Sequence, residues 1–260
     1  MKFIVAVDCD GCACVVGEAG KSLSISRDFR FACEQATREA DAAARALFDA
    51  GAARVIVWDN HGSGANLHFD RLDRRCEIAL GSGFPRRWPG LDDTFAGAVM
   101  IGYHAMAGAG GVLAHTYSPG AYRCVTVNGQ PVGEMAIDAA VAGELGVPVV
   151  FVASDDRGCD EARRCLPWVE TAVTKHAVGV NAAHSVHPAE AVERIARGVR
   201  AAVDRLSSMQ PFALPTPADV VLRFRHPLQA LKARLRRRGW RLAGSHALAT
   251  RVERISEIRW

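Results

Sequence analysis

The 260-residue sequence lacks any apolar stretch that approaches the ~20 residues of a membrane-spanning helix. Its first apolar segment reaches Asp8 too early for the apolar region of a secretory signal. Internal repeats and low-complexity segments are also missing, and 49% hydrophobic with 23% charged residues excludes a disordered or collagen-like chain. We therefore expect a cytoplasmic protein with no membrane partner, folded as one large domain or two small ones.

The eight cysteines do not form paired CxxC motifs. In a chain without an export signal, such thiols are usually reduced and often serve as small buried hydrophobic groups. The sequence therefore predicts no disulfide framework.

Positive charge exceeds negative charge only near the end of the chain. Residues 220–260 hold 11 Lys and Arg against 2 Asp and Glu, which leaves 21 against 26, or a net charge of −5, in residues 1–219. Clustered cations can bind nucleic acid or an acidic lipid surface. Apart from Trp240, no aromatic platform or nucleic-acid motif accompanies them, so a charged surface or a subunit contact is favoured.

The order of segments predicts an α/β fold with a mostly parallel sheet flanked by helices. Short apolar runs that end in polar residues alternate with segments of helical period. An Asn-Gly pair at 128–129 is typical of a hairpin turn. The expected strands are Phe3–Val7, Arg54–Trp58, Glu77–Leu80, Ala98–Tyr103, Val149–Ala153 and Val169–Lys175, and the hairpin is 122–132. The expected helices are 29–48, 134–145, a short stretch that follows Asp156 and runs to Cys165, and 189–206.

A change of composition after this alternation predicts the domain organisation. Residues 207–217 hold three prolines and no periodicity, which is typical of a linker. We therefore expect a metal-binding catalytic α/β domain over 1–206. The basic residues 218–260 would form a smaller α+β appendage with one strand at Val220–Phe224.

Residues able to bind metal follow several of the expected strands. Asp8 and Asp10 follow the first, His61 the second and His104 the fourth, while Glu134 begins the helix after the hairpin. Since loops converge at the carboxyl ends of parallel strands, these five side chains should share one rim. Carboxylates and imidazoles suit Zn²⁺, Mn²⁺ or Co²⁺. Five ligands exceed the needs of one open zinc site, which favours two ions about 3.5–4 Å apart.

In the two-ion interpretation, Asp8 bridges two half-sites, Asp10 with His61 and His104 with Glu134. His115 lies in a glycine-containing loop that can reach the same rim. As a sixth ligand it would be superfluous, whereas an imidazole titrates near neutral pH, so we expect it to act as a general acid/base or nucleophile.

These segments resemble the zinc-dependent D-aminopeptidases of the DppA type, over most of residues 1–190. The motifs that carry the resemblance are VDCDG, WDNH, GLDDTFAGAVMIGYHA, AHTYS, VNGQPVGE and FVASDDRG. The resemblance implies two Zn²⁺ per chain, with the same five ligands and with His115 as the catalytic residue. The family usually has Glu at the third position of the opening motif, where this chain has Asp10.

The expected function is hydrolysis of short peptides or aminoacyl amides that have a free amino terminus. The resemblance adds a preference for D-residues and a homo-oligomer of stacked pentameric rings. Asn128 or a metal would steady the oxyanion, which makes Asn128 a predicted substrate-binding residue.

Two other functions stay open at this point. The segments VDCDG and Ser154-Asp155-Asp156 also look like the motifs of a haloacid-dehalogenase-type phosphatase. That mechanism needs a lysine between the two motifs, but the next lysine after Lys21 is Lys175, and the three site histidines would have no role. The other alternative is a non-enzymatic protein that binds partners through its basic tail.

Overall fold

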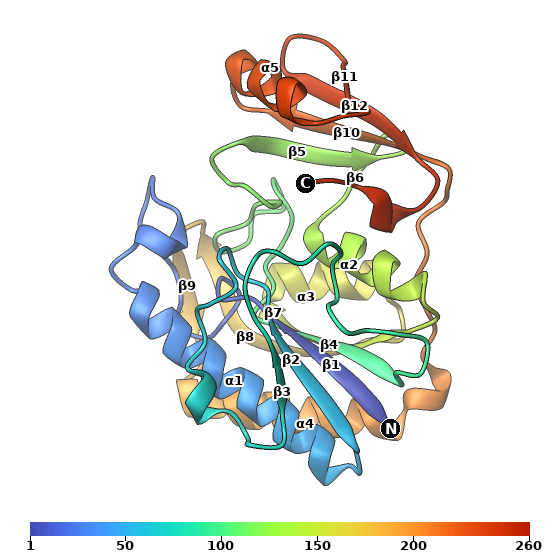
Figure 1. Cartoon of the computed structure of the whole chain (residues 1–260). Helices are drawn as coiled ribbons and strands as arrows, with labels where there is room; N and C mark the ends of the chain where they lie inside the picture. Colours follow the sequence, from blue (N-terminus) through green and yellow to red (C-terminus); the bar gives the residue numbers. More distant parts are fainter.

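The structure, a computed structural model that describes residues 1–260, contains two sheets, and the second lies above the first in the view of Figure 1. The first has seven strands, all parallel except the last pair. This confirms the expected fold class. In spatial order the strands are β3 (Glu77–Ala79), β2 (Arg54–Asp59), β1 (Lys2–Val7), β4 (Gly97–Ile101), β7 (Val149–Asp155), β8 (Glu170–Gly179) and β9 (Ala182–Ser185).

Helices cover both faces of this sheet, which explains why its central strands are apolar without alternation. Phe3, Val5 and Val7 of β1 belong to the same core as α1 (Phe29–Asp49) and α4 (Pro188–Asp204). Ile4 and Ala6 face the other core, to which α2 (Glu134–Gly143) and α3 (Asp156–Cys165) contribute.

The second sheet is antiparallel and draws its strands from two distant parts of the chain. The mid-chain hairpin pairs through β5 (Tyr122–Val127) with β10 (Ala218–Phe224), so residues 122–131 complete the sheet of the C-terminal segment. Helix α5 (Pro227–Arg236) packs against β10 and β12 (Ala247–Val252). The spatial order is β11 (Arg241–Leu242), β12 (Ala247–Val252), β10 (Ala218–Phe224), β5 (Tyr122–Val127) and β6 (Gln130–Pro131).

The expected content of the C-terminal segment needs correction. It contains three strands and one helix, where the sequence predicted one strand, and its sheet is incomplete without the hairpin. The two missed strands, β11 and β12, pair within this segment, and β11 has only two residues. The short strand β9 was also missed, since only pairing with the neighbouring β8 makes it a strand.

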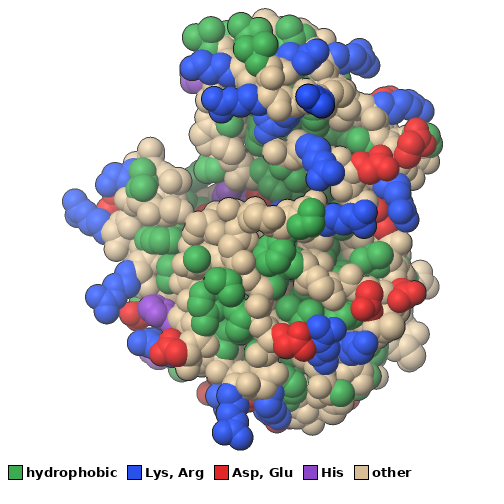
Figure 2. All heavy atoms as spheres, in the orientation of Figure 1, with side chains coloured by type: hydrophobic (Ala, Val, Ile, Leu, Met, Phe, Trp, Pro, Cys, Tyr) green, Lys and Arg blue, Asp and Glu red, His purple; other side chains and the backbone are tan.

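The remaining elements are short, and no helix has the length and apolarity needed to cross a membrane. Lys and Arg side chains gather on the lobe of the second sheet (Figure 2). The 3₁₀ turns are Leu23–Ile25, Phe69–Arg71, Leu206–Ser208 and Ile255–Glu257.

Candidate metal centre

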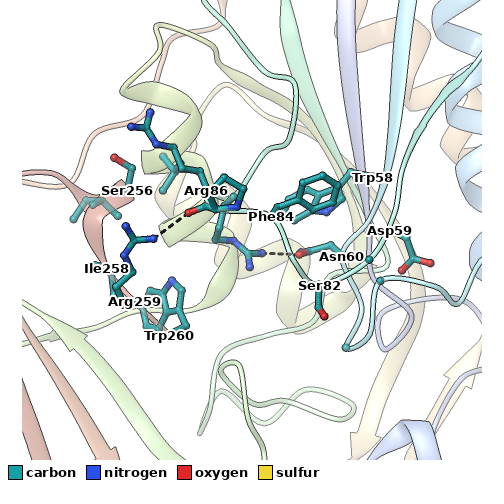
Figure 3. A pocket seen from close by; sticks show the side chains of 17 residues that line it. Trp58, Asp59, Asn60, Ser82, Phe84, Arg86, Ser256, Ile258, Arg259 and Trp260 are labelled. Atoms are coloured by element: carbon teal, nitrogen blue, oxygen red, sulfur yellow. Dashed lines mark hydrogen bonds between the residues drawn. The ribbon is translucent and has the colours of Figure 1, made fainter. Parts of the chain in front are cut away.

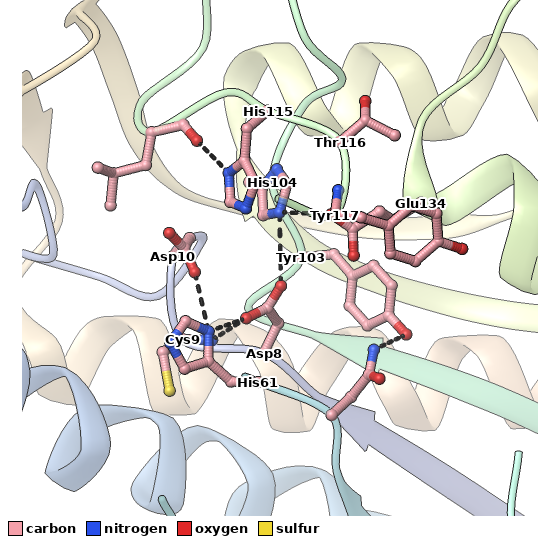
Figure 4. A network of polar contacts seen from close by, with 12 residues as sticks. Asp8, Cys9, Asp10, His61, Tyr103, His104, His115, Thr116, Tyr117 and Glu134 are labelled. Atoms are coloured by element: carbon pink, nitrogen blue, oxygen red, sulfur yellow. Dashed lines mark hydrogen bonds and ion pairs between the residues drawn. The ribbon is translucent and has the colours of Figure 1, made fainter. Parts of the chain in front are cut away.

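The strand ends of the first sheet bring all five predicted ligands and His115 together (Figure 4). Asp8 follows β1 directly, and His61 and His104 come two and three residues after β2 and β4. Glu134 is the first residue of α2. Neighbouring loops pack tightly here, since a Cβ on Gly11 would lie 1.9 Å from the carbonyl oxygen of Tyr103. Glycine at position 11 therefore lets the loop after β1 approach the loop after β4.

The carboxylate of Asp8 lies between two imidazoles. Its Oδ1 is 2.7 Å from Nδ1 of His61, and its Oδ2 is 3.6 Å from Nε2 of His104. Each oxygen therefore faces a different histidine, the arrangement that a carboxylate shared by two ions requires.

Each of those histidines also has a second carboxylate beside it. Asp10 Oδ2 lies 3.1 Å from His61 Nδ1, and Glu134 Oε1 lies 3.3 Å from His104 Nε2. Asp10 is buried, and its Oδ2 has no hydrogen-bond partner besides this contact with the His61 ring. A buried carboxylate oxygen with so few partners is costly unless something else, such as a cation, completes its surroundings.

Backbone contacts orient two of the histidine rings. Nδ1 of His104 contacts the carbonyl oxygen of Ala105 at 3.0 Å, and Nδ1 of His115 contacts that of Leu113 at 2.7 Å. A carbonyl accepts a hydrogen bond, so both Nδ1 atoms carry hydrogen and each Nε2 is left to bind a metal or accept a proton. The two rings stack with their centroids 3.9 Å apart.

His61 has the opposite orientation. Its Nδ1 faces the carboxylates, while its Nε2 lies 3.2 Å from Oγ of Ser24. The half-site with His61 therefore presents an Nδ1 atom to the carboxylates, whereas the half-site with His104 presents an Nε2 atom.

The concentration of acidic groups holds protons on these imidazoles. Burial opposes the charged form of His61, but hydrogen bonding and attraction from Asp10 and Asp8 prevail and raise its pKa to about 11. Burial likewise opposes charge on His104, and Glu134 followed by Asp8 raises its pKa to about 10. Burial also opposes the charged form of Glu134, but hydrogen bonding and attraction from His104 prevail and lower its pKa. Against the same effect of burial, His61 likewise lowers the pKa of Asp10, so Asp10 and Glu134 stay ionised, as ligands of a cation must be.

The donor set fits one or two divalent metal ions. Ligand atoms of His104, His115 and Glu134 lie within 4.8 Å of one another, as do those of Asp8, Asp10 and His104. The first group includes His115, so geometry alone permits it to be a ligand as well as an acid/base. The division of roles between His115 and the other five residues stays a prediction.

A buried lysine supports the loop that carries Asp10. The Nζ atom of Lys175, on β8, donates to the carbonyl oxygens of Asp10, Cys12 and Val15 at 2.6, 2.8 and 2.6 Å. Glu39 of α1 accepts a hydrogen bond from the Ala13 amide in the same loop. The sequence offered one signal for Lys175, a lone lysine at the end of an apolar strand.

The structure does not bring Asn128 to this site. Asn128 occupies the exposed turn between β5 and β6, where Nδ2 donates to the Pro215 carbonyl and Oδ1 accepts from the Asp219 amide. Its side chain ties the hairpin to the segment that enters β10, because pairing with β10 turns the hairpin toward the second sheet.

The five predicted ligands, Asp8, Asp10, His61, His104 and Glu134, are together called the metal-ligand cluster. A cavity of about 280 Å³ opens over this cluster. Two side chains that the sequence reasoning missed line it, Arg87 and Tyr117. Arg87 lies in the irregular segment between β3 and β4, which has no periodicity to mark it. Its partner Asp138 had a detectable signal, since it stands four residues after Glu134 on the same face of α2.

The second motif of the phosphatase alternative has a structural role here. Asp155 caps α3 by accepting from the Gly158 amide, and its other oxygen accepts from Val112 in the loop that leads to His115. The three histidines and Glu134, which a phosphatase would not need, converge with Asp8.

An α/β sheet with carboxylates and imidazoles meeting at its strand ends defines a metal-dependent hydrolase. A family model of peptidases, M55, described as D-aminopeptidase, matches residues 1–258. A D-aminopeptidase of Bacillus subtilis (strain 168) is 32% identical over 236 residues, which cover 90% of this chain and 85% of the relative.

A solved structure is also similar, described as the Zn-dependent D-aminopeptidase DppA from Bacillus subtilis, a self-compartmentalizing protease. It has a TM-score of 0.89 and 29% identity, and the match covers 99% of this chain and 93% of that one. The chain belongs to the M55 D-aminopeptidase family and is a peptide hydrolase. The family predicted from the sequence motifs is thus confirmed, and the phosphatase and binding-protein alternatives are not favoured.

Proposed function

We propose that this chain is a zinc aminopeptidase that releases amino-terminal residues, preferentially D-residues, from short peptides. The observation that carries the proposal is the Asp8 carboxylate, whose oxygens face His61 and His104 separately, each beside a second carboxylate. Support for zinc comes from this donor set and from the similar Zn-dependent structure. Support for the D-preference comes from the family and its named members.

Two Zn²⁺ ions per chain would be held by Asp8 as the shared ligand, Asp10 with His61, and His104 with Glu134. When bound, zinc acts as a Lewis acid on a carbonyl and lowers the pKa of water. The buried Oδ2 of Asp10, which has only the His61 ring beside it, fits this assignment, because a cation there would complete its surroundings. Zinc would also replace the protons that the carboxylates hold on His61 and His104.

His115 is the residue we assign to proton transfer. Its Nδ1–H is fixed on the Leu113 carbonyl, which leaves Nε2 to accept a proton and return it to the leaving amine. The ring is half-buried beside His104 and lines the cavity over the ligands. Its place is therefore suited to a group that must reach both substrate and solvent.

We also propose that the chain assembles with copies of itself into a closed homo-oligomer, of the stacked pentameric type that the sequence resemblance implies. Support comes from the similar structure, which is described as a self-compartmentalizing protease. Light scattering should then give a mass several times 27.9 kDa. A clean monomer at micromolar concentration would contradict this assembly.

The decisive experiment combines metal analysis with activity. The natural chain, purified without chelator, should contain up to two zinc equivalents and hydrolyse D-alanyl p-nitroanilide faster than its L-isomer. Asp8→Ala should lose both equivalents, because Asp8 serves both half-sites, whereas His68→Ala should match the natural chain. Full zinc in Asp8→Ala would overturn the shared-ligand assignment, and absence of hydrolysis by the zinc-loaded natural chain would overturn the function.

A further inference from the structure

Figure 3 shows a second cavity, which shares lining residues with the one over the metal-ligand cluster. Its volume is about 350 Å³, and Asn60, Gly62 and Arg87 line both cavities. The loop before β4 and the C-terminal residues 255–260 form its outer walls. A substrate bound at the metal ligands can therefore extend past Arg87 into this space.

Arg87 is held at the junction with part of its guanidinium unused. Nε and Nη2 donate to the two carboxylate oxygens of Asp138, and Nη2 also donates to Oδ1 of Asn60 at 2.8 Å. The guanidinium lies 5.0 Å from the ring centroid of Trp58 and 5.4 Å from that of Tyr117. Nη1 makes no hydrogen bond, so a rigidly placed cation keeps two N–H donors available.

A second cation, Arg259, lies across the cavity from the strand residues (Figure 3). It donates through Nη1 to the Pro85 carbonyl at 3.1 Å, which leaves Nε and Nη2 free. The acidic residue of the lining, Asp59, already accepts three hydrogen bonds from Asn66 and Leu67. Arg86 also lines the cavity, so the charged groups of the lining that remain available are arginine donors.

Apolar side chains form one part of the cavity wall. Trp58, Phe84, Ile258 and Trp260 line it, and Trp260 stacks on Tyr117 with ring centroids 3.9 Å apart. Tyr117 in turn donates its backbone N–H to Glu134 Oε1 at 2.6 Å, so this wall is connected to the metal-ligand cluster. A ligand that fits such a space has an apolar body and a negatively charged end.

We propose that this cavity binds the leaving-group side of the substrate, and that Arg87, assisted by Arg259, recognises the free C-terminal carboxylate of a short peptide. The inference rests on the proposed aminopeptidase function and adds the substrate class, namely short peptides with an apolar C-terminal residue and a free carboxylate. Guanidinium groups suit this role because their fork of donors matches a carboxylate.

The test compares two matched substrates, D-alanyl-D-phenylalanine and its C-terminal amide, on the zinc-loaded full chain. These substrates differ in one charge at the predicted contact. The natural chain should favour the acid by at least about tenfold in kcat/KM, mainly through KM, since hydrogen bonds to charged groups are worth about 1.5–3 kcal/mol. The double variant Arg87→Gln/Asp138→Asn, which leaves no unpaired buried charge, should reduce that preference to near unity.

A second variant, Arg259→Gln, should fold normally because Arg259 is exposed, so its effect on the substrates does not depend on a change in stability. It should reduce the acid-over-amide ratio severalfold, whereas Arg251→Gln, an exposed change of equal charge on β12 outside the cavity, should preserve the ratio. A structural role alone would lower activity on both substrates equally. An unchanged ratio in both cavity variants, or a natural ratio near one, would overturn the subsite.

Failure of the subsite can be told apart from failure of the proposed function. Hydrolysis of D-alanyl p-nitroanilide without any preference between acid and amide would overturn the subsite alone. If no peptide is hydrolysed, calorimetric binding of the dipeptide acid and amide to the zinc-loaded chain tests the subsite directly. Tighter binding of the acid that Arg259→Gln abolishes would support it, and equal binding would overturn it.

Discussion

Replacing Lys175 with Met should destabilise the protein and disturb one half of the metal centre. Lys175 is fully buried and its ammonium group donates three hydrogen bonds to backbone carbonyls of the loop that carries Asp10. Methionine has similar length and no donor. The substitution therefore leaves three carbonyl oxygens without their partner while largely preserving side-chain volume.

The magnitude follows from the number of bonds lost. Each buried acceptor left unpaired costs about 1–3 kcal/mol, so three give about 3–9 kcal/mol. Removal of the buried ammonium offsets several kcal/mol of its desolvation. We expect a net loss of about 3–5 kcal/mol in the free energy of unfolding, which corresponds to roughly 10 °C in Tm for a chain of this size.

Urea denaturation of the metal-free chain, followed by tryptophan fluorescence at one protein concentration, measures this loss. Lys232→Met, an exposed change on α5, is the matched control and should lose less than about 0.5 kcal/mol. Zinc titration should show weaker binding of one equivalent in Lys175→Met, because the Asp10 loop is no longer held. A loss below about 1 kcal/mol together with two unaltered zinc affinities would refute the reasoning.

Three further predictions concern the histidines. His115→Ala should keep near-normal zinc while losing at least about 10²–10⁴-fold in kcat, and His104→Ala should lose zinc and activity together; loss of zinc from His115→Ala would make His115 a ligand. Zinc binding at pH 7.5 should release up to two protons, because the metal-free site keeps His61 and His104 protonated, and calorimetry in buffers of different ionisation enthalpy measures this number. Since both folded-state pKa values lie above the unfolded value of about 6.5, their stabilisation of the metal-free chain is complete below that pH. It should decline progressively from about pH 6.5 and be fully lost above about 10 to 11, and a urea midpoint that stays constant between these limits would contradict the assigned protonation.

The sequence by itself determined the fold class and which carboxylates and imidazoles meet at the strand ends, while their roles as metal ligands stay a prediction. Continuous apolar strands with polar ends predict a covered parallel sheet, and such a sheet brings its carboxyl ends to one edge. Knowing that Asp8, His61 and His104 each follow a strand was therefore enough to expect them together. The pairing of half-sites around Asp8 likewise agrees with the observed contacts.

Only the tertiary structure decided how distant segments meet. The 122–131 hairpin pairs with β10, which turns Asn128 away from the metal-ligand cluster, and no local pattern encodes such long-range pairing. Lys175 and Arg87 gain their roles from loops far away in sequence, since a cation's partners depend on which carbonyls or carboxylates the fold places around it. The position of a residue at the end of a strand can be predicted from the local sequence. The cavity beside Arg87 cannot, because the C-terminal residues 255–260 form one of its walls.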